Sequence, residues 1–402
     1  MVLSCEYEPR DARLRFGLCM LREMHATAWL RLLAAILLLT ACAIAQTADP
    51  SEAQSLEKAG KFAEAATAWR SVTQHDPRNA AAWASLGLVL SRLQEYPEAA
   101  SAYRKALSLN SKLPGVQLNL GLAEFKQGHF EAAIPPLHAA LARDPDSAQG
   151  HTLLGLSYYG AGRYDESSKY LALASRADPT NRELHRVLAQ SCLSAKKYSC
   201  ALDEFTWILR QNPDSAAAHL LTGEALDGLG RTPEAIAEFE LAVKTDPQAP
   251  NMHFGLGYLY WKMRQYDDAL RTFESELSID PANPQALAYL GDIEMKRGDQ
   301  EKALTLLKKA TALRDDIRIV HLDMGVIFTE QKLYQEALAA LQRARKLDPE
   351  QPEVHYRLGR LYQAMGDGEA AKAEFATVQL LHQKAEDDIA DKMSGQETAR
   401  HP

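Results

Sequence analysis

Six histidines occupy one position of a regular pattern, and histidine is both the commonest metal ligand in proteins and a proton carrier near neutral pH. They are His151, His185, His219, His253, His321 and His355. A zinc site takes its ligands from spacings of about two to five residues on one element, whereas each of these histidines lies at least 34 residues from the next. The spacing therefore predicts no metal site. It predicts imidazoles packed between helices, each with one ring nitrogen hydrogen-bonded locally.

Other motifs that could support catalysis lack the structural context that the chemistry needs. Gly255 and Gly257 lack the third glycine and the preceding strand of a dinucleotide site. Ser157 stands one residue out of register for a nucleophile elbow, again with no strand before it. Acidic pairs such as Asp267 and Asp268 fit solvated helix starts. Because no segment is left for a catalytic domain, the sequence predicts no enzyme, no cofactor and no small-molecule substrate.

The composition and charge are typical of a folded protein without a nucleic-acid-binding face. Hydrophobic residues make up 46% of the chain and charged residues 24%, as in ordinary globular proteins. The formal net charge is -8, and the 45 basic residues are scattered among 53 acidic ones. No basic stripe is present to meet a phosphate backbone, so nucleic acid is not an expected partner.

The amino-terminal segment resembles an export signal. Basic residues precede an apolar run over residues 32–39, which is too short to span a bilayer comfortably but has the length of a signal peptide's hydrophobic region. Acidic residues within positions 1–19 do not suit such a signal, so Met20 or Met24 is a candidate start. The sequence predicts export to the periplasm or to the periplasmic face of the outer membrane.

Two cleavage patterns near the apolar run leave the mature form open. Ala43 and Ala45 followed by Gln46 form the small-x-small pattern that signal peptidase accepts, and cleavage there would release a soluble protein. Residues 39–42 resemble a bacterial lipobox, in which Cys42 would be lipidated and would attach the chain to a membrane. The soluble form is the preferred interpretation, and an uncleaved anchor is the third alternative.

The remaining cysteines of interest are Cys192 and Cys200, because the other three lie in the segment that export would remove or lipidate. In an oxidising compartment this pair could form a disulfide between the two helices of one hairpin. The alternative is two small apolar side chains packed in a helical core. The sequence favours the alternative, because helical spacing alone does not guarantee the required approach of the alpha carbons.

A 34-residue period organises the rest of the chain. An Asp-Pro or Asn-Pro pair recurs at this interval. At two equivalent positions, Asn110-Ser111 and Arg314-Asp315, the proline is absent. Proline cannot donate to the helical ladder and biases the preceding residue away from helix, so each pair is expected to close a helix. The pairs are Asp76-Pro77, Asp144-Pro145, Asp178-Pro179, Asn212-Pro213, Asp246-Pro247, Asp280-Pro281 and Asp348-Pro349.

Two further columns of the period contain only Gly, Ala or Ser. The first includes Gly87 and Gly257, and the second, twelve residues later, includes Ala99 and Ala269. Where two antiparallel helices cross closely, a larger side chain would push their backbones apart. Glycines such as Gly60 lie between the two columns, where a first helix would end in the left-handed conformation. Each period therefore predicts a helix, a turn, a second helix and a second turn.

This pattern resembles the signature of the tetratricopeptide repeat family. The residues that carry the resemblance are Trp83, Leu86, Gly87, Ala99, Tyr103 and Ala106 in one repeat and Leu154, Gly155, Tyr158, Ala174 and Pro179 in another. The resemblance covers about residues 50 to 383 and implies an all-α, right-handed α-solenoid (superhelix) of about ten helical hairpins, whose first helices line a concave groove. The predicted organisation is an amino-terminal extension with a signal peptide over 1–45, the repeat array over 46–383, and a capping helix extension with a disordered tail over 384–402.

Some first helices are apolar on two faces, and the second face predicts a partner-binding groove. In one repeat, Phe254, Tyr258 and Trp261 form a stripe of their own beside the packing residues. Such a face is either buried against neighbouring helices or offered to a partner, and aromatic side chains are the better candidates for anchors. The predicted groove residues are Leu118, Leu122, Phe125, Leu156, Tyr159, Phe254, Tyr258 and Trp261, with Arg186 and Arg360 as polar anchors.

The groove columns also favour one class of partner. Tetratricopeptide domains that clamp the C-terminal carboxylates of chaperones place Lys and Asn on this face, and that pair is absent here. The resemblance therefore implies an extended or helical protein segment held by apolar and aromatic contacts. The favoured hypothesis is a protein-binding scaffold of the bacterial cell envelope. The alternative is a docking or regulatory arm of an enzyme, such as a glycosyltransferase, whose catalytic part is a separate chain. A cytoplasmic co-chaperone is disfavoured by the predicted export signal and by the absence of the Lys and Asn clamp pair.

Overall fold

The described part of the chain is entirely helical. The computed structural model describes residues 49–394, and its side chains over residues 49–390. The predicted signal peptide, the Cys42 lipidation site and the tail over 395–402 lie outside the described residues. Twenty helices and no strand are present in residues 49–394, so the predicted all-α solenoid of tetratricopeptide hairpins is confirmed.

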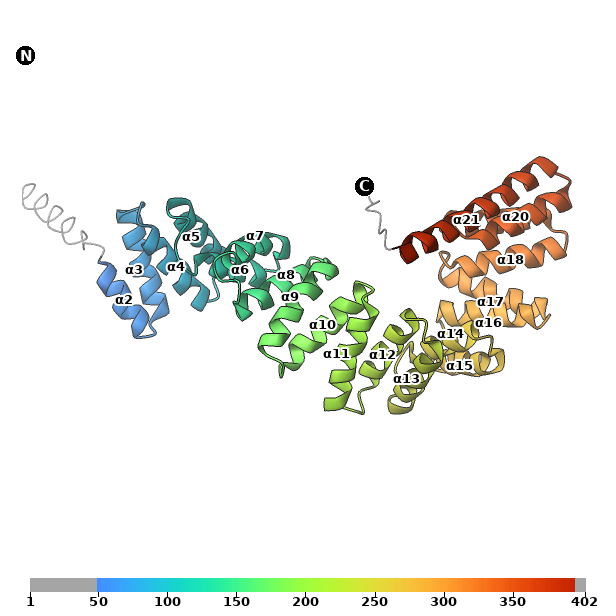
Figure 1. Ribbon diagram of the computed structural model, residues 1–402, viewed down its shortest axis with the longest axis horizontal. Helices are drawn as coiled ribbons and strands as arrows, with labels where there is room; N and C mark the ends of the chain where they lie inside the picture. The colour runs from blue at the N-terminus through green and yellow to red at the C-terminus, as the bar shows by residue number, and fades with distance from the viewer. Residues whose placement is uncertain (1–48, 395–402) are drawn as a thin grey trace, which may run out of the picture. The chain divides into compact units, whose positions relative to one another are not determined.

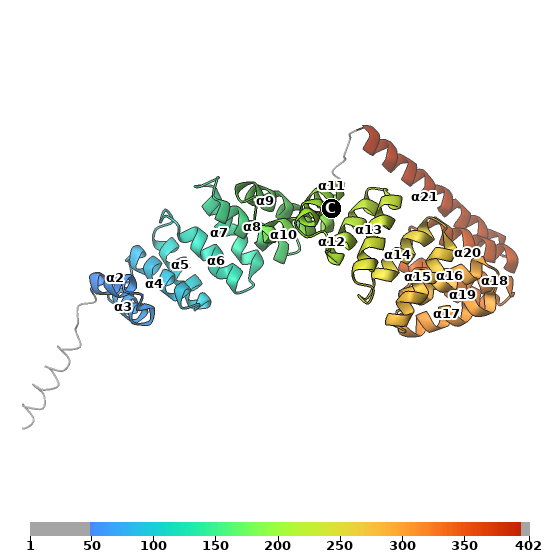
Figure 2. The ribbon, with the colours of Figure 1, turned by 90° about the horizontal axis from the view of Figure 1, so that it is seen from below.

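The chain divides into two compact units, of which the first ends at Arg163 and the second begins at Tyr164. Within each unit, consecutive hairpins lie side by side in both views (Figures 1 and 2). The helices of unit 1 are α2 (Pro50–Lys58), α3 (Phe62–His75), α4 (Ala80–Arg92), α5 (Tyr96–Leu109), α6 (Val116–Lys126), α7 (Phe130–Leu141) and α8 (Ala148–Gly160). The helices of unit 2 are α9 (Tyr164–Ala177), α10 (Arg182–Ser194), α11 (Tyr198–Gln211), α12 (Ala216–Gly228), α13 (Thr232–Thr245), α14 (Met252–Lys262), α15 (Tyr266–Ile279), α16 (Pro284–Lys296), α17 (Gln300–Leu313), α18 (Arg318–Glu330), α19 (Tyr334–Leu347), α20 (Pro352–Met365) and α21 (Gly368–Ser394).

The columns of small residues mark the places where the two helices of a hairpin cross. A β-carbon added to Gly257 on α14 would lie 2.7 Å from the ring of Phe273 on α15. In the same way, a β-carbon on Gly325 would lie 2.5 Å from Leu341. These distances are well inside van der Waals contact, so the predicted reason for the glycine column is confirmed. The side chain sixteen residues later fills the space that the glycine leaves.

The turn inside each hairpin uses one left-handed residue, as the glycine pattern predicts. Gly60, Gly128 and Gly162 have φ values of 73, 76 and 74°, and Gly230, Gly298 and Gly366 have the same sign. Where glycine is absent, other residues adopt this conformation, with φ between 57 and 63°: Gln94, Lys196, Arg264 and Lys332. The repeat geometry therefore imposes a backbone conformation that these four side chains disfavour.

The last helix extends well beyond the length of the other second helices. α21 runs without a break from Gly368 to Ser394, which confirms the predicted extension of the final helix. Leu380 and Ile389 on it are 68% and 59% exposed. None of the helices within residues 49–394 combines the length and the apolar character needed to cross a membrane.

The hairpin of α10 and α11 contains a disulfide. Cys192 and Cys200 are bonded, and their alpha carbons are 5.8 Å apart, within the range of about 4.4–6.8 Å that a disulfide requires. The preference for two unbonded cysteines is therefore wrong. The pair lies across a hairpin turn, where the two helices necessarily approach each other, and this closeness provides what helical spacing alone does not.

Replacing Lys332 by glycine is expected to stabilise the fold. A left-handed conformation costs a residue with a side chain about 1–2 kcal/mol, and the freedom of glycine in the unfolded chain offsets part of the gain. We expect Lys332→Gly to raise the free energy of unfolding by roughly 0.5–1 kcal/mol in urea denaturation followed by circular dichroism. The control Gln342→Gly, at an exposed position inside α19, should lower it by about 0.5–1 kcal/mol; destabilisation by both substitutions would refute the strained turn.

Reduction of the disulfide is expected to destabilise unit 2. Closing a loop of this length restricts the unfolded chain by about 2–3 kcal/mol, so dithiothreitol should lower the urea midpoint of the oxidised chain. The double variant Cys192→Ala with Cys200→Ala should show no response to the reductant. Alkylation by iodoacetamide of both residues in the unfolded, unreduced chain would show that the bond does not form.

Candidate partner-binding groove

The first helices of the repeats form the inner side of unit 2. Within the described residues, α14 packs on α16, α16 on α18 and α18 on α20, whereas no two second helices pack on each other to that extent. From α14 to α20 the first helices are therefore closer together than the second helices, and their side is the concave one there. A partner that follows the array contacts these first helices.

A pocket opens on this side between α12 and α14. Its volume is about 390 Å³, which suits one or two side chains of a bound segment. Apolar walls come from Leu220, Phe239, Phe254, Tyr258 and Leu259. Of the predicted groove residues, Phe254 and Tyr258 line this pocket.

Two carboxylates at the same pocket differ in their surroundings. Asp227 accepts hydrogen bonds from Thr232 Oγ1 and Lys262 Nζ, both at 2.7 Å. Glu224 reaches solvent, yet the surrounding helices remove much of its hydration, and this desolvation raises the pKa of its carboxyl. The pocket therefore combines an apolar wall with a hydrogen-bonded acid, Asp227, and an exposed acid of raised pKa, Glu224.

A buried glutamate fixes the start of α14 and so the position of the aromatic stripe. Glu276 on α15 is fully buried. Its Oε1 accepts the backbone N–H of Asn251 at 2.9 Å, and its Oε2 accepts that of Phe254 at 3.1 Å. The side chain of Asn283 also donates to Oε1 at 3.1 Å. A carboxylate at a helix N-terminus is favoured by the unpaired N–H groups there, and this one comes from the neighbouring helix.

Phe254, Tyr258 and Trp261 belong to a cluster of rings that joins α14 to α16. The ring of Tyr289 on α16 lies 5.5 Å from that of Tyr258 and 4.9 Å from that of Trp261, edge to face in both cases. Phe254 packs 5.9 Å from the buried Phe273. Burial raises the pKa of Tyr289 to about 12. All three predicted residues are half-buried, so they stabilise the helix contact and still present surface on the inner side.

Two buried acids adjoin the ring cluster. Asp292 on α16 is 1% exposed and accepts the indole N–H of Trp261 at 2.5 Å. It also forms an ion pair with Lys296. Asp323 on α18 is 3% exposed, and its Oδ2 has no hydrogen-bond donor within the described side chains. Desolvation, followed by repulsion from Asp292, raises the pKa of Asp323 well above its ordinary value.

The predicted groove residues of unit 1 lie on its first helices. Leu118, Leu122 and Phe125 are half-buried on α6, and Leu156 and Tyr159 are half-buried on α8. The ring of Phe125 packs 5.7 Å from that of Phe130 on α7. These residues therefore also combine packing with partial exposure, and their role in partner binding stays a prediction.

The two predicted polar anchors do not line the pocket. Arg186 on α10 is exposed and donates two hydrogen bonds to Glu183 one turn earlier, at 2.9 and 2.6 Å. Arg360 on α20 is exposed, and its guanidinium lies 3.4 Å from the hydroxyl of Tyr356. Both are surface positions, and their role as anchors likewise stays a prediction.

The histidines at this position of the repeat form hydrogen bonds to the turns between repeats. Nε2 of His219 donates to the carbonyl oxygen of Pro213, six residues earlier, at 2.8 Å. Trp83 uses its indole N–H in the same way on the carbonyl of Pro77. The predicted local hydrogen bond of one ring nitrogen is therefore confirmed, and imidazole replaces indole without losing the bond.

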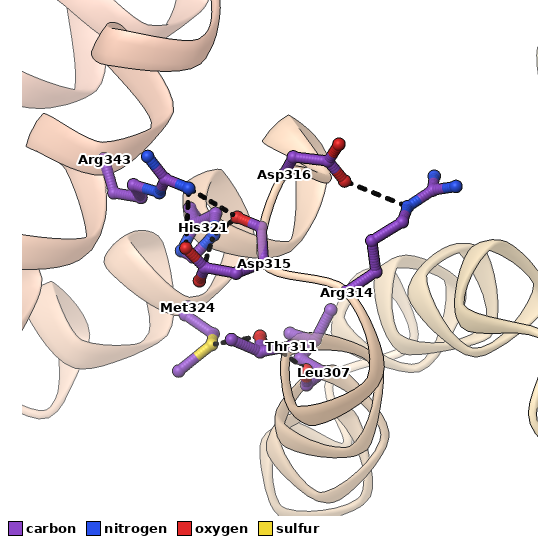
Figure 3. Close-up of polar contacts among 8 residues, drawn as sticks. All are labelled: Leu307, Thr311, Arg314, Asp315, Asp316, His321, Met324 and Arg343. Carbon is purple, nitrogen blue, oxygen red and sulfur yellow. Dashed lines mark hydrogen bonds and ion pairs between the residues drawn. The ribbon is translucent and has the colours of Figure 1, made fainter. Parts of the chain in front are cut away.

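One turn without proline shows the same arrangement (Figure 3). His321 bonds the carbonyl oxygen of Asp315 at 2.8 Å, although aspartate stands here in place of proline. Arg343 from α19 pairs with the carboxylate of Asp315 at 2.6 Å, and Arg314 pairs with Asp316 at 3.0 Å (Figure 3). Ion pairs thus accompany the ring-to-carbonyl bond where the stiffening effect of proline is missing.

The sequence interpretation missed the second partner of three histidines. Nδ1 of His219 lies 2.6 Å from the carboxylate of Glu238, nineteen residues later on the second helix. The same contact joins His185 to Glu204 and His355 to Glu374. A glutamate at that fixed interval was the available signal. Among the described residues, no group of three or more His, Cys, Asp or Glu side chains is placed to hold a metal.

Family models of the tetratricopeptide repeat match this chain over most of its length. The matches cover residues 51–114, 118–182, 186–250, 254–317, 301–352 and 328–393. The chain belongs to the tetratricopeptide repeat (TPR) family. TPR arrays are in general modules for protein–protein interaction, and the repeats of this chain support a role as an interaction scaffold.

Solved TPR structures resemble parts of the chain. The structure named MamA MSR-1 C2 is 25% identical, with a TM-score of 0.37, and the match covers 41% of this chain and 95% of that one. MamA 41-end from Desulfovibrio magneticus RS-1 is 22% identical, with a TM-score of 0.37 and coverage of 40% and 90%. YrrB, described as a TPR protein with an unusual peptide-binding site, is 21% identical, with a TM-score of 0.35 and coverage of 44% and 91%. No curated protein sequence matches the chain.

Asp323 is expected to make the stability of this TPR array depend on pH. Its pKa is raised in the folded state above the ordinary value of 3.8, so above that pH the folded state holds a proton that the unfolded state has lost. The free energy of unfolding then falls as pH rises from about 4 through the folded pKa. We expect Asp323→Asn to be more stable than the natural chain at pH 7 and the difference to shrink towards pH 4, in urea titrations at both values. Glu336→Gln, an exposed acid on α19, is the control, and an equal pH response in all three proteins would contradict the assignment.

Proposed function

We propose that this TPR protein is an exported scaffold of the bacterial cell envelope that binds a partner polypeptide along the concave side of unit 2. The observation that carries the proposal is the pocket of about 390 Å³ between α12 and α14, with Leu220, Phe254 and Tyr258 in its wall. Half-buried aromatic side chains around a pocket are the usual anchors of a protein contact. The bound segment places an apolar side chain in the pocket and continues over the neighbouring first helices.

The shape of the pocket supports an extended or helical segment as the ligand. Apart from Phe239 on α13, its lining comes from the successive first helices α12, α14 and α16 and the start of α14, with Gln285 at the α16 edge. A ligand that runs across the helices contacts the same column in each repeat, so side chains at regular intervals can be recognised. Each buried apolar side chain contributes about 1.5–3 kcal/mol, and several such contacts produce a stable complex.

Two features support export. The segment before Gln46 has an apolar run and the cleavage patterns of an exported protein. The disulfide between Cys192 and Cys200 suits an oxidising compartment such as the periplasm, because thiols in the cytosol are kept reduced. Neither feature depends on the groove, so location and binding are tested separately.

Photocrosslinking in cells tests the binding surface. A benzoylphenylalanine placed at Leu220 is expected to trap a discrete partner, because this side chain lines the pocket. The same probe at Leu241, which is 42% exposed on the second helix α13, is the matched control and should trap none. Tyr258→Ala should weaken the affinity for the purified partner roughly 30-fold, as expected for an anchor residue. Equal crosslinking from both positions, or unchanged affinity of a folded Tyr258→Ala protein, would disprove this placement.

The mass of the intact mature protein tests the location. Cleavage after Ala45 leaves Gln46 as the first residue, whereas lipobox processing leaves a lipidated Cys42. Either mass in the envelope fraction supports export. An unprocessed chain in the cytoplasm would overturn it and would leave the binding surface to be judged by the crosslinking.

A further inference from the structure

We propose that Asp292 and Asp323, with the rings of Tyr258, Trp261 and Tyr289, form a binding site for a lysine or arginine side chain of the bound segment. This group is called the acidic–aromatic site. It adjoins the pocket of the proposed function through Tyr258, which belongs to both. The inference rests on that function, because the cation is carried by the partner polypeptide.

Asp323 is the observation that requires a ligand. A buried carboxylate oxygen without a donor is costly, and Oδ2 of Asp323 is such an atom within the described side chains. The residue as a whole is only 3% exposed, and Oδ2 itself is buried. If the acid only filled space there, the protein would be more stable with an apolar residue of the same size at this position. A donor that arrives with a ligand supplies what the fold leaves out.

The cations around Asp323 are already paired with other acids. Arg318 on α18 pairs with Asp348 at 3.5 Å, and Arg357 on α20 pairs with Glu353 at 2.7 Å. The third cation, Lys296 on α16, pairs with Asp292. With these pairs formed, Asp323 has no cation of its own when it is ionised.

Lys296 shows how a bound cation would be held. Its ammonium group pairs with Asp292 and lies 5.7 Å from the centroid of the Trp261 ring, the combination of carboxylate and aromatic face that attracts cationic groups. Lys296 is the last residue of α16, and 36% of its side chain is exposed. Lys296 pairs with Asp292 and not with Asp323, so it stays in place and the ligand cation supplies the donor that Asp323 lacks.

The walls of the site favour the long side chains of lysine and arginine. The rings of Trp261 and Tyr289 are 4.9 Å apart and half-buried, so an aliphatic stem can cover them while its charged end meets the acids. A metal ion is a poorer fit, because one carboxylate is already held by the indole N–H of Trp261. An anion is excluded by the two acids. The recognised segment thus carries an apolar residue for the pocket and a basic residue for the acidic–aromatic site.

A random dodecapeptide display library, selected on the immobilised full chain, tests this inference. Peptides recovered on the natural chain and lost on Tyr258→Ala define the groove ligands. We expect these peptides to share a Lys or Arg at a fixed distance from an apolar residue. Selection on Asp323→Asn should recover the apolar residue without the basic one, and selection on the control Glu336→Gln should match the natural chain.

Affinities of one selected peptide make the test quantitative. Changing its basic residue to methionine should weaken binding to the natural chain about tenfold or more, as for a hydrogen bond to a charged group, and should change binding to Asp323→Asn little. Lys296→Met, which removes the internal cation and keeps the stem, should bind the basic peptide several-fold more tightly than the natural chain.

The outcomes separate this inference from the proposed function. Groove peptides without a basic residue, or with equal basic enrichment on Asp323→Asn, would overturn the acidic–aromatic site and leave the pocket supported. If Asp323→Asn only raised the thermal midpoint and kept the peptide specificity, the two acids would be a structural pair and the inference would fail. Recovery of no Tyr258-dependent peptide at all would overturn the proposed function and this inference with it.

Discussion

The close crossing of two helices within each hairpin is the constraint on which the rest of the structure depends. At the crossing one helix has glycine and the other places a large side chain against it, as Gly257 does with Phe273 and Gly325 with Leu341. So close a contact buries one stripe of each helix only. Because the remaining apolar stripes must be covered by the next hairpin, a single repeat is unstable alone and the repeats stack.

Stacking gives each first helix three faces, each with different contacts. One face meets the second helix of the same repeat, another meets neighbouring first helices, and the third faces the groove. Tyr258 shows that the last two overlap, since its ring packs on that of Tyr289 and also lines the pocket. This overlap is the physical reason why partial exposure, and not full exposure, characterises the groove residues. It also explains why partner specificity can change by substitutions in one column while the hairpin geometry is kept.

The features that all repeats share could be predicted from the sequence, whereas the contacts found in single repeats could not. The period, the turns with Gly60 and its equivalents, and the histidine bond to a carbonyl six residues earlier follow from local chemistry that recurs in every repeat. The disulfide, the cap of α14 by Glu276 and the contact of Trp261 with Asp292 depend on which residue a neighbouring helix presents. One sequence feature points to Asp323: the equivalent position in other repeats holds Val187, Leu221 and Tyr289. An acid in such a column signals a local exception, but only the fold shows that its neighbour is a second acid.

A linear array can carry a destabilising group that a single compact core tolerates less well. In a stacked protein each repeat contacts only its neighbours, so the stability is approximately a sum of repeat and interface contributions. The cost of burying Asp323 is therefore confined to the contacts of α18 with α16 and α20, which adjoin it. The many interfaces that it does not touch keep the array folded. Binding of a cation there recovers the local cost, so the same buried charge that weakens the free protein strengthens the complex. The constraint that forces repeats to stack thus also makes room for a charged recognition site inside the stack.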